Sequence, residues 1–241
     1  MDFVNALVLL SNFVIVPALS YGSQLALGAI GVTLIYGILR FANFAYGDLM
    51  AFGTMFAILF TWFFQSIGIN LGVLPTALLA IPFAIIIAIL FSLLIDKFVF
   101  SYYRIKKSPP VTLAMVSIGV MFVINAIIRI IIGPFDRRFF DGERFIIRAN
   151  EFKEMTGLNE GLAIKSTQVL TLFVTIVVAS ILFWFLNKTR TGKSMRAYSD
   201  NEDLALLSGI SPERVVMITW IIAAILATIA GTLYGLDKSF K

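Results

Sequence analysis

The residue types that most often carry covalent or metal chemistry are scarce in this sequence. Its 241 residues include no histidine and no cysteine, which excludes disulfide bonds, zinc–thiolate sites, thiol nucleophiles and imidazole bases. No serine is paired with a plausible base, so the sequence argues against an enzyme. The remaining candidates are two charged side chains inside long apolar stretches, Asp48 and Arg129.

The composition is that of a membrane protein. Hydrophobic residues make up 59% of the chain and charged residues 14%, against roughly 45–50% and 25% in soluble globular proteins. No charge lies between Asp2 and Arg40, whereas residues 134–166 hold twelve, six basic and six acidic. Long uncharged runs between charged connectors indicate a polytopic membrane protein. The net charge of +5 comes from basic residues beside apolar runs, as the positive-inside tendency produces, so nucleic acid is excluded as a partner.

We expect an all-α bundle of about six to seven transmembrane helices, because about 20 apolar residues cross the hydrocarbon as a helix. The bundle forms a single domain over residues 1–241. The first two spans are either separate or one broken helix, since Pro17 and Ser23 interrupt them, and Pro75 should delay the start of the fourth. The candidate spans are 3–20, 24–39, 44–64, 71–98, 111–133, 167–187 and 213–236.

Basic residues in the short connectors predict the orientation. Residues 97–110 carry four basic residues beside Asp96, and residues 188–196 carry four with no acid, so both connectors are placed in the cytoplasm. Two spans separate them, which puts the loop 134–166 outside and Arg40 on the cytoplasmic side. The first 39 residues contain no lysine or arginine, so this rule assigns no side to the N-terminus.

Asp48 and Arg129 each have a structural and a functional interpretation. Asp48 and nearby Asn43 are placed where a span leaves the cytoplasmic side. A carboxylate inside an apolar run is costly unless it is hydrated or paired, and is therefore a functional candidate. The favoured structural interpretation is that Asp48 caps its helix or lies at the headgroup level, facing Arg40. For Arg129, four residues before Gly133, snorkelling to the outer interface is favoured over a role as a ligand.

The cytoplasmic connector before the last span is predicted to contain a short helix, about 200–208. Ser199 followed three residues later by Glu202 fits a capping box. Gly209 suits a left-handed C-terminal cap, and Pro212 opens the last span. A helix this short is marginal in water on its own, so it packs against its own bundle or against a soluble partner.

The same connector carries a second pattern, Asp203-Leu204-Ala205 followed by Gly209. It resembles a relaxed form of the EAA-x-x-x-G loop of ATP-binding-cassette (ABC) importer permeases, with Asp for the first Glu and Leu for the first Ala. In those permeases the loop forms a coupling helix that docks in a cleft of the ATPase subunit. The resemblance implies an ATPase-coupling role for Glu202, Asp203, Ala205, Leu206 and Gly209.

A more specific pattern occupies residues 28–53. Its first segment contains Gly31, Thr33, Leu34, Ile35, Tyr36 and Gly37, and its second contains Asn43, Phe44, Ala45, Gly47 and Asp48. These residues resemble the G-x-T-L-I-Y-G and N-F-A-H-G-D-like segments of the LivH-like branched-chain amino acid permease family, with Tyr46 in place of the usual histidine. The resemblance covers about residues 25–235. It makes Asn43, Gly47 and Asp48 candidates for the substrate path.

The resemblance implies a permease subunit of an ABC importer for branched-chain or related amino acids in the bacterial inner membrane. The implied partners are a second, LivM-like permease, two ATPase subunits that bind the ATP, and a periplasmic substrate-binding protein. This chain is expected to bind no cofactor or metal. Thr191-Gly192-Lys193-Ser194 looks like the tail of a P-loop, but Asn187 stands where the first glycine belongs and no strand precedes it.

The competing function is an ion-coupled secondary transporter or a channel. Proton coupling usually uses chains of intramembrane carboxylates or histidines, and this sequence offers Asp48 and little else. Sodium coupling through backbone carbonyls stays open as an alternative.

The last span carries small residues at a spacing of four, which lets two helices approach closely. Packing inside this chain is favoured over a contact with a partner permease. Members of the family generally continue with further membrane segments after this span, so the chain is expected to be short at its C-terminus. The small residues are Ala223, Ala227, Gly231 and Gly235.

Overall fold

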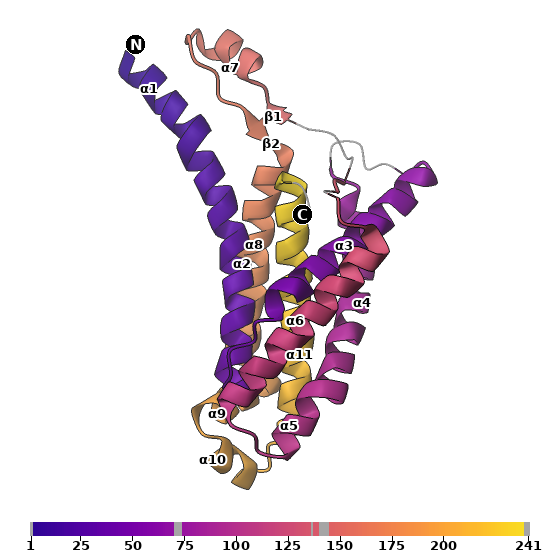
Figure 1. The fold of residues 1–241 in the computed structure, drawn as a ribbon. Helices are drawn as coiled ribbons and strands as arrows, with labels where there is room; N and C mark the ends of the chain where they lie inside the picture. Colours follow the sequence, from indigo (N-terminus) through magenta and orange to yellow (C-terminus); the bar gives the residue numbers. More distant parts are fainter. Residues whose placement is uncertain (1, 70–73, 136, 140–144, 239–241) are drawn as a thin grey trace.

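The computed structural model is an all-α membrane bundle with a small hairpin at one end (Figure 1). It describes residues 2–69, 74–135, 137–139 and 145–238. The predicted multi-pass helical architecture is confirmed. Among the described residues, six helical segments are long and apolar enough to cross a membrane: Phe3–Leu39, Tyr46–Ser66, Ala77–Ile105, Pro110–Ile132, Ser166–Lys188 and Pro212–Asp237.

The first segment is one continuous helix, which resolves the alternative left open for the N-terminal stretches. It consists of α1 (Asp2–Leu10), the π-helical turn η1 (Ser11–Ile15) and α2 (Val16–Leu39). Pro17 follows shortly after the π-helical turn η1, a local irregularity that lets a continuous helix accommodate a residue without an N–H. The Ser23 hydroxyl donates to the Leu19 carbonyl of its own helix at 2.7 Å, so a serine here does not interrupt the helix.

The segment predicted over 71–98 continues further than expected. It contains α4 (Ala77–Ile95), η2 (Asp96–Phe100) and α5 (Ser101–Ile105), while residues 70–73 lie outside the described part of the chain. Arg104 donates to Asp96 with both terminal nitrogens, at 2.5 and 2.9 Å, and this pair stabilises the charged extension. Hydropathy predicts where a helix leaves the membrane but not where the helix itself ends, and this helix continues to Ile105.

The last span, α11 (Pro212–Asp237), is the centre of the bundle. It packs against α2, α3 (Tyr46–Ser66) and α4. Of its most apolar stretch, 72% is buried, against 6% for the first segment and 6% for α8 (Ser166–Lys188). The outer helices therefore present apolar faces to the surroundings, while α11 is enclosed by protein.

The small residues of α11 face neighbours within this chain. Ala223 and Ala227 are completely buried. A Cβ atom on Gly231 would lie 2.3 Å from the Thr54 Oγ1 and 2.7 Å from the Met50 carbonyl oxygen of α3. This close approach of α3 and α11 is what the spacing of small residues makes available.

Short elements lie at the two ends of the bundle (Figure 1). At one end, β1 (Phe145–Ile147) and β2 (Ile164–Lys165) form an antiparallel pair around α7 (Ala149–Thr156). At the other end lie α9 (Arg190–Asp200) and α10 (Glu202–Leu207). The hairpin with α7 and the connector with α9 and α10 thus lie at opposite ends of the bundle.

The close contact between α3 and α11 predicts that one methyl group added at position 231 lowers the stability of the bundle. Gly231→Ala should lower the stability of the bundle by about 1–3 kcal/mol, the usual range for overpacking a tight core, because both nearest atoms belong to an adjacent helix. Thermal unfolding of the purified protein in detergent measures this. Gly119→Ala is the matched control, since a Cβ at position 119 meets nothing within 4 Å. Equal unfolding temperatures for the two variants would contradict the packing described.

Candidate functional site

The helical chain is broken between α2 and α3, at the residues of the family-like pattern. Arg40 takes a left-handed conformation, with φ 58°, and its N–H donates to the Tyr36 carbonyl to close α2. The following residues form a non-helical link that rises beside α6 (Pro110–Ile132) before α3 begins at Tyr46 (Figure 1). We refer to residues 40–45 as the intramembrane link.

Contacts with α6 place this link inside the bundle. The Phe44 N–H donates to the Ser117 hydroxyl at 3.0 Å, and Ser117 is completely buried. Its own hydroxyl hydrogen goes to the Ala114 carbonyl at 2.7 Å. Ser117 lies seven residues into α6, roughly 10 Å along the helix at 1.5 Å per residue. The link therefore lies beside the second turn of α6 rather than beyond the end of that helix.

Asp48 lies still deeper. The Asn125 amide nitrogen donates to Asp48 Oδ1 at 3.3 Å, and Asn125 is fifteen residues into α6, roughly 22 Å along a helix of that pitch. The suggested contact of Asp48 with Arg40 is not formed, because a terminal nitrogen of Arg40 donates to the Ser199 carbonyl. Asp48 lies in the first turn of α3, beside the second half of α6 rather than at an end of that helix.

Asn43 builds the start of α3. Its side-chain oxygen accepts a hydrogen bond from the Ala45 N–H at 3.1 Å, and its carbonyl accepts from the Tyr46 N–H at 3.4 Å. It also lines a small cavity with Val120 and Trp220. These contacts give Asn43 a structural role, since they satisfy backbone donors that the first turn of a helix leaves free.

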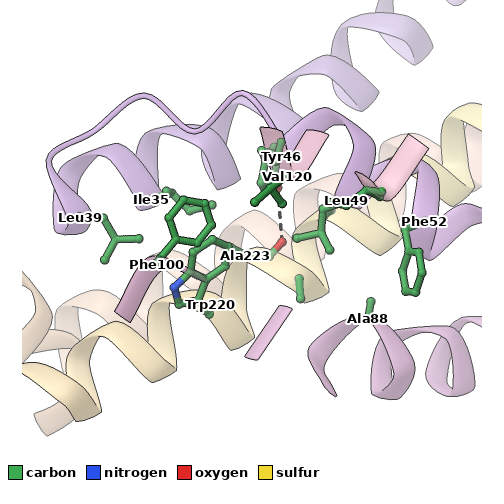
Figure 2. Packing of buried hydrophobic residues seen from close by; sticks show 14 of the residues in the cluster. Ile35, Leu39, Tyr46, Leu49, Phe52, Ala88, Phe100, Val120, Trp220 and Ala223 are labelled. Carbon is green, nitrogen blue, oxygen red and sulfur yellow. Dashed lines mark hydrogen bonds between the residues drawn. The ribbon is translucent and has the colours of Figure 1, made fainter. Parts of the chain in front are cut away.

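Tyr46 is a core residue. Its side chain is 2% exposed, and its hydroxyl is directed at the Ala223 carbonyl of α11 at 3.4 Å (Figure 2). A Cβ on Gly31 of α2 would lie 1.8 Å from the Tyr46 hydroxyl oxygen. The glycine of the first family-like segment thus provides the space that the tyrosine of the second segment fills.

Arg129 joins Asp48 through Asn125. The Arg129 Nε donates to the Asn125 side-chain oxygen at 2.8 Å. The Nε of this exposed side chain is therefore turned toward Asn125. Gly47, next to Asp48, is exposed. Asp48, Asn125 and Arg129 form one hydrogen-bonded polar cluster, whereas Asn43 bonds to the backbone of Ala45 and Tyr46.

The cytoplasmic connector contains two helices where one was predicted. The Thr189 side chain accepts from the Gly192 N–H at 3.0 Å and opens α9, so the residues that look like a P-loop tail lie in a helix. The Asn201 side chain accepts from the Leu204 N–H at 3.0 Å and opens α10. The capping box assigned to Ser199 and Glu202 is wrong, because Ser199 lies inside α9 and its backbone is helical.

Hydrogen bonds fasten α9 to the end of α2. The Ser199 hydroxyl donates to the Gly37 carbonyl at 2.9 Å, and its own carbonyl accepts from Arg40. The Tyr198 hydroxyl donates to Glu202 at 2.7 Å. Burial, followed by the neighbouring Glu202 carboxylate, raises the pKa of Tyr198 above its ordinary value, so this hydroxyl stays a donor. Helices α9 and α10 are thereby held to the end of the bundle at which α2 finishes.

The predicted coupling residues divide into buried and exposed groups. Ala205 is 3% exposed, and its carbonyl accepts from the Ile210 N–H at 3.0 Å. Gly209 takes a left-handed conformation with φ 81°, as expected for its place after the helix. Glu202, Asp203 and Leu206 are exposed. Leu204 and Leu207 are the most exposed apolar side chains of α10, at 61% and 85%.

Asn125 and Ser117 were not predicted as site residues, and only Asn125 has a signal in the sequence. Asn125 and Arg129 are four residues apart in one apolar span, a spacing that places their side chains together and could have been recognised. Ser117 has no such signal, because its role depends on a link 73 positions away that only the fold brings beside it.

Loss of the Ser117 hydroxyl should destabilise the intramembrane link. Ser117→Ala leaves the Phe44 N–H without an acceptor in a buried site, which typically costs about 1–3 kcal/mol, so the unfolding temperature in detergent should fall. The matched control is Ser66→Ala, whose hydroxyl is exposed and donates within its own helix. If both variants unfold at the wild-type temperature, the link does not depend on Ser117.

Comparison with known proteins shows which family this chain resembles. The sequence profile described as "Branched-chain amino acid transport system / permease component" matches residues 14–240. The high-affinity branched-chain amino acid transport system permease protein LivH of Escherichia coli K12 is 28% identical over 217 residues, covering 89% of this chain and 67% of LivH. The corresponding permease protein BraD of Pseudomonas aeruginosa is 28% identical over 231 residues, covering 92% of this chain and 70% of BraD.

A more distant organism provides a third relative. A probable branched-chain amino acid transport permease protein LivH of Methanocaldococcus jannaschii is 27% identical over 220 residues, covering 90% of this chain and 64% of that protein. No solved structure gives a significant match. The family profile covers both the intramembrane link and helices α9 and α10. The chain therefore belongs to the permease component family of branched-chain amino acid transport systems.

Proposed function

We propose that this chain is a permease subunit of an ABC importer that moves branched-chain amino acids across a bacterial inner membrane. The single observation that carries the proposal is the family match over residues 14–240. The similar proteins LivH and BraD are named as permease proteins of high-affinity branched-chain amino acid transport. The proposed assembly adds a second permease, two ATPase subunits that bind ATP and an external substrate-binding protein.

The surface of α10 supports docking of an ATPase. Leu204, Leu206 and Leu207 are exposed on a helix of six residues, at the end of the bundle assigned to the cytoplasm. Exposed leucines this close together form an apolar patch that a protein partner would cover. Membrane lipid is a poor alternative cover, since α9 and α10 lie at the end of the bundle beyond the spanning helices (Figure 1).

In the proposed mechanism, this chain supplies the path and the partners supply the energy. ATP-driven closure of the ATPase pair would move α10 and favour one conformation of the bundle over another. Docking can shift such an equilibrium only by the difference in its binding free energy between the two conformations. An ion-coupled transporter is the second candidate, and the exposed leucines of α10 favour the ABC importer over it.

The proposal predicts that one exposed leucine is needed to retain the ATPase. Leu207→Glu places a charge at the most exposed position of α10 and should weaken ATPase binding at least about tenfold, because centrally placed apolar anchors dominate interfaces. The measurement is retention of the ATPase on the tagged chain after extraction from membranes, together with ATP-dependent uptake of L-leucine.

Met155→Glu in α7 is the matched control, since Met155 has the same 85% exposure as Leu207 but lies at the opposite end of the bundle (Figure 1). Ala205→Glu would be uninformative, because Ala205 is buried and its replacement disturbs α10 itself. Retention of the ATPase by Leu207→Glu at the wild-type level would exclude the exposed leucines of α10 as the docking surface.

A further inference from the structure

A row of polar side chains follows the α3–α6 side of the bundle. Asn125 stands in the middle, donating to Asp48 Oδ1 at 3.3 Å and accepting from Arg129 Nε at 2.8 Å. Neither Asp48 nor Arg129 forms an ion pair with another described residue. The negative and the positive charge are thus held apart by a single neutral amide.

The row is accessible from outside the chain. Arg129 is exposed, and Asp48 and Asn125 are half-buried. Gly47, which precedes Asp48, is exposed, and a Cβ placed on it would meet nothing within 4 Å. Ionisable groups at this depth are unfavourable against hydrocarbon and usually face a water-filled cavity or a bundle interior. This side of the chain therefore borders a polar space in the working assembly.

The Asn125 amide shows which ligand chemistry would fit the two charges. Its N–H group is directed at the carboxylate and its oxygen at the guanidinium, so it acts as a small dipole of fixed direction. An α-amino acid zwitterion has the same polarity, with an ammonium donor and a carboxylate acceptor. One carbon separates the nitrogen and oxygen of the amide, and two separate those of the amino acid.

We propose that Asp48, Asn125 and Arg129 form a binding site for the head group of an α-amino acid on its way through the membrane. Arg129 binds the carboxylate, Asp48 binds the ammonium group, and Asn125 holds the two charges apart while the site is empty. The side chain of the ligand extends toward the exposed Phe44 and Phe122. This inference rests on the proposed function, because it presumes that amino acids pass along this chain.

The first test measures uptake of radiolabelled L-leucine by the assembled importer in proteoliposomes. Asp48→Asn and Arg129→Gln keep the size of each side chain and remove its charge. Each should reduce uptake at least about tenfold, as expected for loss of a hydrogen bond to a charged group. Arg148→Gln, in the exposed outer extension, is the matched control and should transport normally.

The second test reports binding directly, without the external binding protein. Because the chain has no cysteine, Phe122→Cys gives a single reactive thiol beside Asn125, in an assembly whose other subunits lack accessible cysteines. Saturating L-leucine should slow its modification by a methanethiosulfonate reagent. Neither 4-methylpentanoate, which lacks the ammonium group, nor 3-methylbutylamine, which lacks the carboxylate, should do so. Val123→Cys, exposed on another side of α6, should show no protection.

The outcomes separate this inference from the proposed function. Normal uptake by both charge variants, or equal protection by leucine and its two analogues, would overturn the head-group site and leave the importer assignment intact. If the variants lose the second permease on purification, the row is a subunit contact and the inference is wrong. If the wild-type assembly takes up no leucine, the proposed function fails and the head-group site with it.

Discussion

The hydrocarbon core of a membrane offers no hydrogen-bond partners, so any break in a transmembrane helix must be satisfied by the protein itself. The intramembrane link is such a break, and the surrounding structure depends on satisfying it. The left-handed Arg40 closes α2, the Asn43 side chain accepts from the start of α3, and Ser117 accepts from Phe44. Polar side chains that look isolated in an apolar sequence are there because the backbone is irregular.

The same break explains the packing of small residues at the centre. A helix that begins inside the membrane brings its first turn, with Tyr46, against two neighbouring helices. Gly31 leaves space for the tyrosine hydroxyl, and Gly231 allows the following turns of α3 to approach α11. A larger side chain at either position would push α3 outward. Asp48 would then move with it, away from Asn125. The packing of the core thus fixes the position of a charged group on the surface of the chain.

The sequence predicts what depends on composition and local spacing, and misses what depends on depth. Apolar run length locates the spans, and the family-like pattern singles out Asn43, Gly47 and Asp48. Run length cannot show that α3 begins beside the middle of α6, because residues 41–47 carry no charge and look like the end of an apolar stretch. The predicted N-cap of α10 is wrong for a different reason. Ser199 and Asn201 are both good N-cap residues. The contact of Ser199 with α2 keeps Ser199 inside α9, so Asn201 caps α10.

The cytoplasmic helices and the intramembrane link share one anchoring point. Ser199 of α9 bonds to Gly37 in the last turn of α2 and to Arg40, the first residue of the link, while Glu202 of α10 bonds to Tyr198 of α9. These hydrogen bonds connect α10, through α9, to Arg40, the residue at which α2 ends. A displacement of α10 would therefore act on Arg40. A continuous helix resists bending through its hydrogen-bond ladder, whereas the link has few backbone bonds to break. When α9 is displaced, the link therefore changes conformation more easily than α2 does. Because the link leads directly into α3, such a change would move α3 together with Asp48.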